Sequence, residues 1–272
     1  MAYLGPPGTF TEEAAQQYLE TRDTPLSLRD YSTIDQVVEA VQRGEVDQGL
    51  VPLENSLEGG VSVTLDLLAN SQEVYVNQEM VCGIEHCLLA DSRSSINDIK
   101  ELYSHPQVFS QCRTFIREHL PGVKRIPWHS TAAAASMVIN TKGKGALASR
   151  RAAQLFQLEV LASSVQDGNG NQTRFVVIDR EDHPYTGKDK TSLVVYIKDG
   201  PGSLYEILRT FALHRINLTR IESRPARKSL GDYLFFIDLE GHREEQEVKT
   251  ALGELKEQVL FMKMLGSYPR QQ

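Results

Sequence analysis

Short apolar runs alternate with amphipathic stretches from Met1 to about Ile178. After Thr33 the apolar residues recur at i, i+3, i+4 and i+7, the spacing of one helix face, and Gly44 marks the end. Similar patterns predict helices over 10–19, 61–68 and 151–156, strands over 49–51, 74–76, 81–89, 145–148 and 173–178, and a helix-strand set over 95–102, 106–120, 123–126 and 130–139. Alternating β and α elements favour mostly parallel sheets with helices on both faces.

Two such sets indicate a bilobal α/β domain over 1–180. One lobe is predicted over about 1–75 with 160–180, and the other over about 76–159. Open sheets of this class bind ligands beyond the carboxyl ends of their strands, near helix N-termini. A cleft between the lobes is therefore the expected site.

The pattern changes after segment 181–190, which is polar, contains Pro and Gly, and is predicted to be a linker. Residues 191–272 then show strands and amphipathic helices in the order βαββαβ. The strands are predicted over 193–197, 217–223, 233–239 and 259–265, and the helices around 204–211 and over 244–255. This order is typical of a ferredoxin-like α+β domain.

Composition narrows the class of protein. The net charge is -7 and no basic run offsets it, which argues against nucleic acid as a partner. No apolar stretch approaches the roughly 20 residues that cross a membrane, and the N-terminus shows no secretory signal. Cys82, Cys87 and Cys112 lack metal-ligand spacing, so we expect reduced thiols in a cytoplasmic protein.

The strongest candidate for a binding loop is 169–175, in which Gly and Asn residues precede Thr173, Arg174 and Phe175 at the start of a strand. Gly and Asn let such a loop curve closely around a ligand, while the strand fixes the side chains. Alternation places Thr173 and Phe175 on one face. Arg174 lies on the other face, where it either joins the site or anchors the neighbouring layer. A plain polar turn before a strand is the alternative.

Three further turns place polar residues near a predicted helix. Thr9 ends a Gly- and Pro-rich turn, and the N–H groups of the following helix attract an anion, although a Gly- and Pro-rich turn alone more often only joins a strand to a helix. The run 54–56 offers three consecutive hydrogen-bonding side chains, although a helix cap with a solvated glutamate fits it equally well. Ser130 caps a helix whose first turn begins at Thr131 and contains small residues, suited to a ligand carboxylate or to close helix packing.

Ser104 and His105 precede Pro106, which suits the first position of a helix, and Gln111 follows in the same helix. His105 is either a cap or a general base. The chain contains no dinucleotide-binding glycine motif, phosphate-binding loop, zinc spacing or nucleophile elbow. The chemistry is therefore expected to need no cofactor and no metal.

Together these segments resemble the prephenate dehydratase family over essentially the full length. The motifs that carry the resemblance are 5–10, 52–56, 104–107 with Gln111 and Cys112, 130–134 and 171–175. The tail resembles an ACT regulatory domain of the phenylalanine-responsive kind through 202–204 and 222–225, with Ser203 where Ala is usual. The resemblance implies a periplasmic-binding-protein-like catalytic domain of two α/β lobes, followed by a ferredoxin-like ACT domain. No fused chorismate mutase is expected.

The resemblance implies decarboxylating dehydration of prephenate to phenylpyruvate in phenylalanine biosynthesis, driven largely by formation of the aromatic ring. Thr173 would donate a hydrogen bond to the leaving oxygen, with Glu54 as the candidate for the ultimate proton source. One preorganised donor contributes on the order of 10²–10³ in rate. The implied substrate-binding residues are Thr9, Asn55, Ser56, Ser104, Gln111, Ser130, Thr131, Arg174 and Phe175.

The ACT-like tail implies that L-phenylalanine binds there and inhibits. The implied effector residues are Gly202, Ser203, Leu204, Asn217, Leu218, Glu222, Ser223, Arg224 and Pro225. An open sheet edge favours pairing with a second subunit, so we expect a homodimer through ACT domains, or a homotetramer. Two alternatives remain: an arogenate dehydratase, which acts on the aminated analogue, and a non-catalytic amino-acid-sensing protein, in which the Thr173 hydroxyl would be superfluous.

Overall fold

The computed structural model describes residues 1–22, 26–168, 170–198, 200–226 and 233–271. Asn169 in the candidate binding loop and Asp199 in the tail lie outside the described residues. The chain divides into two compact units. The first unit consists of Met1–Thr33, Glu54–Gly59 and Val81–Thr173, and the second of Ile34–Leu53, Gly60–Met80 and Arg174–Gln272.

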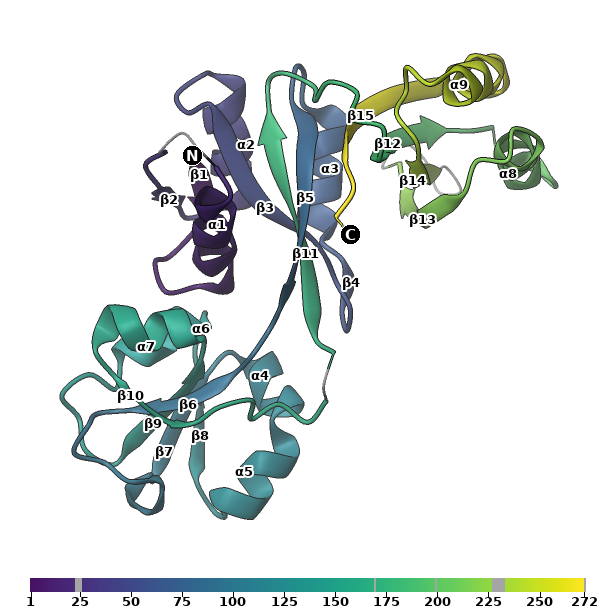
Figure 1. Ribbon diagram of the computed structural model, residues 1–272. Helices are drawn as coiled ribbons and strands as arrows, with labels where there is room; N and C mark the ends of the chain where they lie inside the picture. The colour runs from purple at the N-terminus through teal and green to yellow at the C-terminus, as the bar shows by residue number, and fades with distance from the viewer. Residues whose placement is uncertain (23–25, 169, 199, 227–232, 272) are drawn as a thin grey trace. The chain divides into compact units, whose positions relative to one another are not determined.

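The first sheet has the strand order β2-β1-β3-β11-β5, and β4 pairs with β3 (Figure 1). Its strands are β1 (Ala2–Leu4), β2 (Arg29–Tyr31), β3 (Gln48–Asn55), β4 (Gly59–Gly60), β5 (Tyr75–Gly83) and β11 (Gln172–Asp179). The helices connected to these strands are α1 (Phe10–Glu20), α2 (Ile34–Gln42) and α3 (Ser62–Asn70). The predicted apolar face of α2 is buried, because Val37, Val38 and Val41 are withdrawn from solvent.

The second sheet has the strand order β10-β6-β9-β7-β8. Its strands are β6 (Cys87–Ala90), β7 (Glu101–Ser104), β8 (Lys124–Pro127), β9 (Lys144–Ala148) and β10 (Glu159–Ala162). Helices cover both faces: α4 (Pro106–Gln111) and α5 (Arg113–His119), and α6 (Thr131–Ser136) and α7 (Arg150–Phe156). Successive residues of β6 divide between the two cores, since Leu89 packs with α6 and α7 and Leu88 with α4 and α5.

The tail forms an antiparallel sheet in the order β13-β14-β12-β15. Its elements are β12 (Asp189–Tyr196), α8 (Ser203–Leu213), β13 (Leu218–Pro225), β14 (Tyr233–Glu240), α9 (Gln246–Gln258) and β15 (Phe261–Pro269). Both helices pack on one face, where Leu193 and Val195 meet Phe211 of α8 and Leu255 of α9. Ser192 alternates with these residues and is buried with polar partners instead.

The predicted fold class is confirmed: two α/β sheets precede a ferredoxin-like α+β domain. The second sheet is mixed rather than mostly parallel, because β6 runs antiparallel to both β9 and β10. Hydrophobic periodicity predicts strands but carries no information on their direction. The predicted helix over 106–120 is interrupted at Cys112, whose φ of -113° and ψ of 25° are not helical.

Two predicted boundaries also differ. β3 continues through Asn55, so Glu54 and Asn55 belong to a strand end rather than to a loop. β12 begins at Asp189, inside the predicted linker, and the buried Asp189 carboxylate accepts hydrogen bonds from the backbone N–H groups of Thr186 and Gly187. No helix in the described part of the chain is long and apolar enough to span a bilayer.

Candidate active site

Thr173 and Asn55 form a direct hydrogen bond. Thr173 is 8% exposed, and the Asn55 Nδ2 donates to its Oγ1 over 2.9 Å. The same amide nitrogen donates to the Asn171 Oδ1 over 2.9 Å. Because the Thr173 oxygen accepts from Asn55, the hydroxyl proton is directed to another acceptor. No protein acceptor for that proton occurs among the hydrogen bonds of the described residues, so the hydroxyl is placed to act as a donor to a ligand.

The orientation of the Asn55 amide is fixed by the backbone that follows it. Its Oδ1 accepts from the backbone N–H groups of Leu57 (2.9 Å) and Glu58 (3.2 Å). The carbonyl oxygen therefore faces backbone donors, and the amide nitrogen must face Thr173. The side chain of Ser56 joins the same loop to β11, donating to the Gly170 carbonyl (3.0 Å) and accepting from the Gln172 N–H (2.9 Å).

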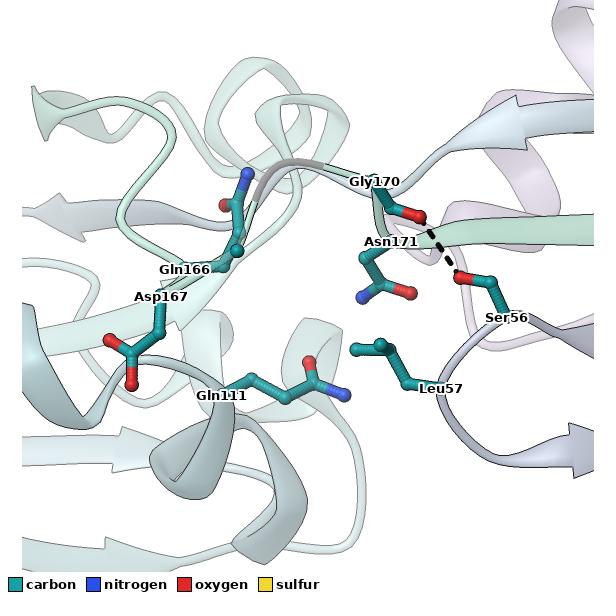
Figure 2. Close-up of a pocket in the computed structure, with 8 residues that line it drawn as sticks. Ser56, Leu57, Gln111, Gln166, Asp167, Gly170 and Asn171 are labelled. Carbon is teal, nitrogen blue, oxygen red and sulfur yellow. Dashed lines mark hydrogen bonds between the residues drawn. The ribbon is translucent and has the colours of Figure 1, made fainter.

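A pocket of about 310 Å³ lies beside this pair of residues. It is lined by Ser56, Leu57, Gln111, Gln166, Asp167, Gly168, Gly170 and Asn171. Figure 2 shows the side chains of Gln111 and Leu57 pointing toward each other across the pocket, with the Asn171 amide directed between them. The polar lining therefore comes mainly from uncharged amides, which donate and accept hydrogen bonds without adding charge.

Two residues of this region were not identified from the sequence. His86, only 3% exposed, lies within hydrogen-bond distance of Gln111, with 2.9 Å between His86 Nε2 and Gln111 Oε1. The Gln111 Nε2 donates to the Glu58 Oε1 over 3.4 Å. Burial lowers the pKa of His86, and partial burial raises the pKa of Glu58 against the opposing influence of His105. The only sequence signal was the position of His86 just before an apolar strand.

Several residues predicted to bind substrate are already used in structural contacts. Ser104 is fully buried, and its hydroxyl donates to the Leu147 carbonyl over 2.7 Å, so the structure does not bring it to the pocket. Thr9 caps α1 by accepting from the Glu12 N–H. Ser130 caps α6 in the same way, accepting from the Ala133 N–H over 3.1 Å, with Thr131 as the first helical residue.

The anion position predicted at the start of α1 is filled by the protein itself. The buried Glu12 carboxylate accepts from the Gly8 N–H over 2.5 Å and from the Arg151 Nη2 over 3.0 Å. The Gly8 carbonyl in turn accepts from the Ser149 hydroxyl, which joins this turn to the start of α7. The turn is thus closed by an internal carboxylate rather than left open to a ligand.

Arg174 lies on the face of β11 opposite to Thr173 and belongs to a buried polar cluster. Its Nε is 2.9 Å from the Glu79 Oε2, its Nη1 donates to the Asp238 Oδ2 over 2.6 Å, and its Nη2 donates to the Tyr268 hydroxyl over 2.8 Å. Burial alone would raise the pKa of Asp238, but Arg174, the hydrogen bond from Ser192 and the charge of Arg220 together hold that pKa below its usual value. The structure therefore places Arg174 in the layer between β11 and the tail. Of the two positions predicted for Arg174, in the site or in the neighbouring layer, the structure shows the second.

Glu54 and Phe175, which also belong to the predicted site, flank the pair formed by Asn55 and Thr173. Glu54 is partly buried beside Asn55 at the end of β3. Phe175 is fully buried in β11, where its ring contributes to the core. Neither residue lines the pocket beside Gln111.

The residues predicted to bind an effector fall into two groups. Ser203 and Leu204, at the start of α8 after the cap residue Gly202, line a pocket of about 110 Å³ with Tyr233 and Phe235. Asn217 and Leu218 begin β13, and Leu218 packs against the core of the tail.

In the second group, Glu222 and Arg224 contact β4 and α3, whereas Ser223 and Pro225 alternate with them and are exposed. Arg224 donates to both carboxylate oxygens of Asp66, over 2.9 Å from Nε and 3.0 Å from Nη2. Glu222 pairs with Arg220, and its carboxylate lies so close to Gly60 that a Cβ there would collide with it. Ser223 and Pro225 complete this end of β13.

The fold and the pocket define a small-molecule enzyme with an ACT regulatory tail. The family model of prephenate dehydratase matches residues 1–183, and that of the ACT domain matches residues 191–257. The chain belongs to the prephenate dehydratase family, whose members are dehydratase lyases.

The chain is similar to named relatives over almost its whole length. It is 44% identical to the bifunctional chorismate mutase/prephenate dehydratase of Aquifex aeolicus over 99% of this chain and 73% of that protein. It is 38% identical to the prephenate dehydratase of Methanocaldococcus jannaschii over 98% of this chain and 97% of that protein. It is also 38% identical to arogenate dehydratase 2 of Petunia hybrida over 99% of this chain and 71% of that protein.

Solved structures with a similar fold include a prephenate dehydratase and a protein described by another activity. The prephenate dehydratase of Arthrobacter aurescens in complex with L-Phe has a TM-score of 0.90 and 37% identity, covering 99% of this chain and 89% of its own. A structure described as GqqA, a novel type of quorum quenching acylase, has a TM-score of 0.88 and 32% identity, covering 99% and 97%. Since one fold carries more than one described activity, the substrate must be argued from the site.

Proposed function

We propose that this enzyme converts prephenate to phenylpyruvate, carbon dioxide and water. The bond between the ring carbon and the departing carboxyl group breaks, and its electron pair enters the ring as the C–O bond to the 4-hydroxyl breaks. The ring becomes aromatic, so the reaction balances without an oxidant, a reductant or a further reactant. The enzyme has to bind two carboxylates and help a hydroxide leave.

The observation that carries the proposal is the hydrogen bond from the Asn55 amide to the Thr173 oxygen. It leaves the Thr173 hydroxyl as a donor, held in one place by a strand and by an amide whose own orientation is fixed. A donor fixed before the reaction stabilises the charge that develops on a leaving oxygen without reorganisation. A Thr hydroxyl is a weak acid, so its role is a hydrogen bond or relay, with Glu54 as the proposed ultimate proton source.

The pocket lining supports binding of the rest of the substrate. Gln111 and Asn171 offer side-chain amides within one pocket, whose volume of about 310 Å³ lies at the lower end of the range for small-molecule sites. Ser56 also lines the pocket, but its hydroxyl hydrogen is already donated to the Gly170 carbonyl. Ser130 and Thr131 at the start of α6 remain proposed carboxylate partners. We leave Ser104 and Arg174 out of this set, since their polar atoms are used elsewhere.

The activity is tested by adding prephenate or arogenate separately to the purified protein with a chelator and without nucleotide. Phenylpyruvate formed from prephenate, at a higher kcat/KM than phenylalanine formed from arogenate, is the expected result. Preference for arogenate would favour the second candidate, which the Petunia relative motivates. Turnover of neither substrate would overturn the proposal and favour a protein that only senses amino acids.

We also propose that L-phenylalanine binds to the ACT domain, in a dimer through these domains or in a tetramer, and inhibits. The support is the pocket at the start of α8 and the L-Phe complex of the Arthrobacter relative. Calorimetry on the full chain should show binding that Ser203→Phe abolishes by filling the pocket. The control is a variant of exposed Tyr205, which does not line that pocket. Unchanged binding by Ser203→Phe would contradict this site.

A further inference from the structure

His86 connects the backbone between β5 and β6 to the pocket in two ways. Its imidazole Nε2 lies 2.9 Å from the Gln111 Oε1. Its backbone N–H donates to the Gln166 Oε1 over 3.0 Å, and its carbonyl accepts from the Val165 N–H over 3.0 Å. Gln111 and Gln166 both line the pocket. One buried residue thus contacts two of the amide side chains that line the pocket.

The direction of the contact with Gln111 follows from its other partner. The Gln111 Nε2 donates to the Glu58 carboxylate over 3.4 Å, so its Oε1 is the atom that faces His86. An amide oxygen only accepts, and therefore the His86 Nε2 carries the hydrogen. The reversed amide would place its oxygen against the Glu58 carboxylate and lose that hydrogen bond, so the contact with Glu58 is what favours the orientation with Oε1 toward His86. Burial lowers the pKa of His86 and so favours the neutral ring, to which this geometry assigns the tautomer with hydrogen on Nε2.

The other ring nitrogen of His86, Nδ1, is buried and makes no hydrogen bond to the described part of the protein. The Phe10 ring packs edge-on at 5.3 Å between centroids, an apolar contact. A buried nitrogen without a partner destabilises the fold. The one polar contact of this side chain is therefore the bond that orients Gln111.

We propose that His86 is a positioning residue for the reaction: its Nε2–H fixes the Gln111 amide so that the NH₂ group faces the pocket as a donor to substrate. This inference rests on the proposed function, since it assigns Gln111 to substrate binding. Only one of the two ring nitrogens contacts Gln111, because Nε2 lies at the far end of the ring and Nδ1 lies near the backbone. Gln and Asn side chains imitate these two positions separately.

The test compares His86→Gln with His86→Asn. The Gln amide nitrogen reaches the place of Nε2, and the Asn amide nitrogen reaches only the place of Nδ1. We expect His86→Gln to keep kcat/KM within about threefold and His86→Asn to lower it roughly tenfold or more, mainly through KM. In a Gln111→Ala background, His86→Asn should have no further effect. Equal losses in both His86 variants, or an undiminished loss in the Gln111→Ala background, would overturn the proposal.

An NMR measurement separates failure of this proposal from failure of the proposed function. In ¹⁵N-histidine-labelled wild-type protein, His86 should show the neutral tautomer with hydrogen on Nε2, and Gln111→Ala should shift that resonance. This result is expected whatever substrate the enzyme uses. A resonance with hydrogen on Nδ1, or one unaffected by Gln111→Ala, would refute the contact itself. Melting temperatures of the variants show whether a loss of activity comes from unfolding.

Discussion

The Thr173 hydroxyl acts within a set of three side chains, because Asn55 holds its oxygen and Asn171 shares the same amide. In the hydrogen bond between Asn55 and Thr173, it is important for the proposed reaction that Asn55 is the donor. An amide donor at position 55 leaves the threonine hydrogen available for the proposed bond to the substrate, whereas an acceptor at position 55 would receive that hydrogen bond itself.

Asn55→Asp tests this direction with almost no change of shape. The carboxylate still accepts from the Leu57 and Glu58 N–H groups, but it accepts from Thr173 instead of donating to it. We expect kcat to fall at least about tenfold, since the donor to the leaving oxygen is diverted. Steady-state kinetics with prephenate would measure the loss, and circular dichroism would verify the fold. Unchanged kcat in a folded variant would show that the Asn55 amide does not direct the Thr173 proton.

The sequence predicted some site residues and missed others for identifiable reasons. Thr173 and Asn55 lie in polar runs beside apolar strands, which is a local signal. Glu12 was not predicted to fill the anion position of its own helix, because that depends on Arg151 packing from a distant helix. For His86 the only local signal is its position before an apolar strand, because its contact with Gln111 joins residues 25 positions apart.

At the scale of elements, β13 connects the tail to α3 and β4. The Arg224 guanidinium holds both oxygens of Asp66, and the Glu222 carboxylate packs on Gly60, two residues after Glu58. Asp66, Gly60, Glu222 and Arg224 all belong to the second compact unit, so an effector that shifts β13 would act on α3 and Gly60 through these contacts. We propose this as the route of inhibition.

Asp66→Asn should weaken inhibition while leaving turnover in the absence of effector within about twofold. It removes the charge that holds Arg224, and coupling between sites of this kind amounts to a factor of roughly 5–150. We expect the phenylalanine concentration for half inhibition to rise by about fivefold or more. Glu39→Gln is the matched control, because it breaks an exposed pair between Glu39 of α2 and Arg43, the residue that follows this helix. Equal inhibition of wild type and Asp66→Asn would exclude this contact from the route.

Element types were predicted better than element ends. The apolar face of α2 and the βαββαβ order of the tail follow from local periodicity, which the structure confirms. The break between α4 and α5 at Cys112 and the start of β12 at Asp189 were missed. Both depend on tertiary contacts: Cys112 is fully buried, and Asp189 turns the backbone at Thr186 and Gly187.

At the scale of the whole molecule, the second compact unit joins the tail to β3, α3 and most of β5 and β11. Arg174 of β11 and Glu79 of β5 meet Asp238 and Tyr268 of the tail in a buried cluster. Gly266 of β15 approaches the Val76 backbone so closely that any Cβ would collide with it. These contacts were not predictable, because the sequence shows only a polar linker between two regular patterns.

The cluster predicts that a chain ending at Lys188 is less stable than the full chain. Truncation removes Asp238 and Tyr268 and leaves Arg174 with one carboxylate, Glu79, on a face that loses its cover. We expect Tm by calorimetry to fall by roughly 4 °C or more. Glu240→Gln in the full chain, which breaks an exposed pair with Arg270, should change Tm by less than about 1 °C. A truncated chain that melts like the full chain would show that the cluster contributes no net stability.

The turnover of Thr173→Val tests most directly whether the Thr173 hydroxyl donates to the leaving oxygen of the substrate, as we propose. Valine keeps the shape and loses the donor, whereas Thr173→Ser keeps the donor and serves as the control. We predict that Thr173→Val lowers kcat for phenylpyruvate formation by at least ~10²-fold, with an unchanged circular dichroism spectrum, and that Thr173→Ser retains more activity. Near-normal turnover in a correctly folded Thr173→Val protein would contradict the account.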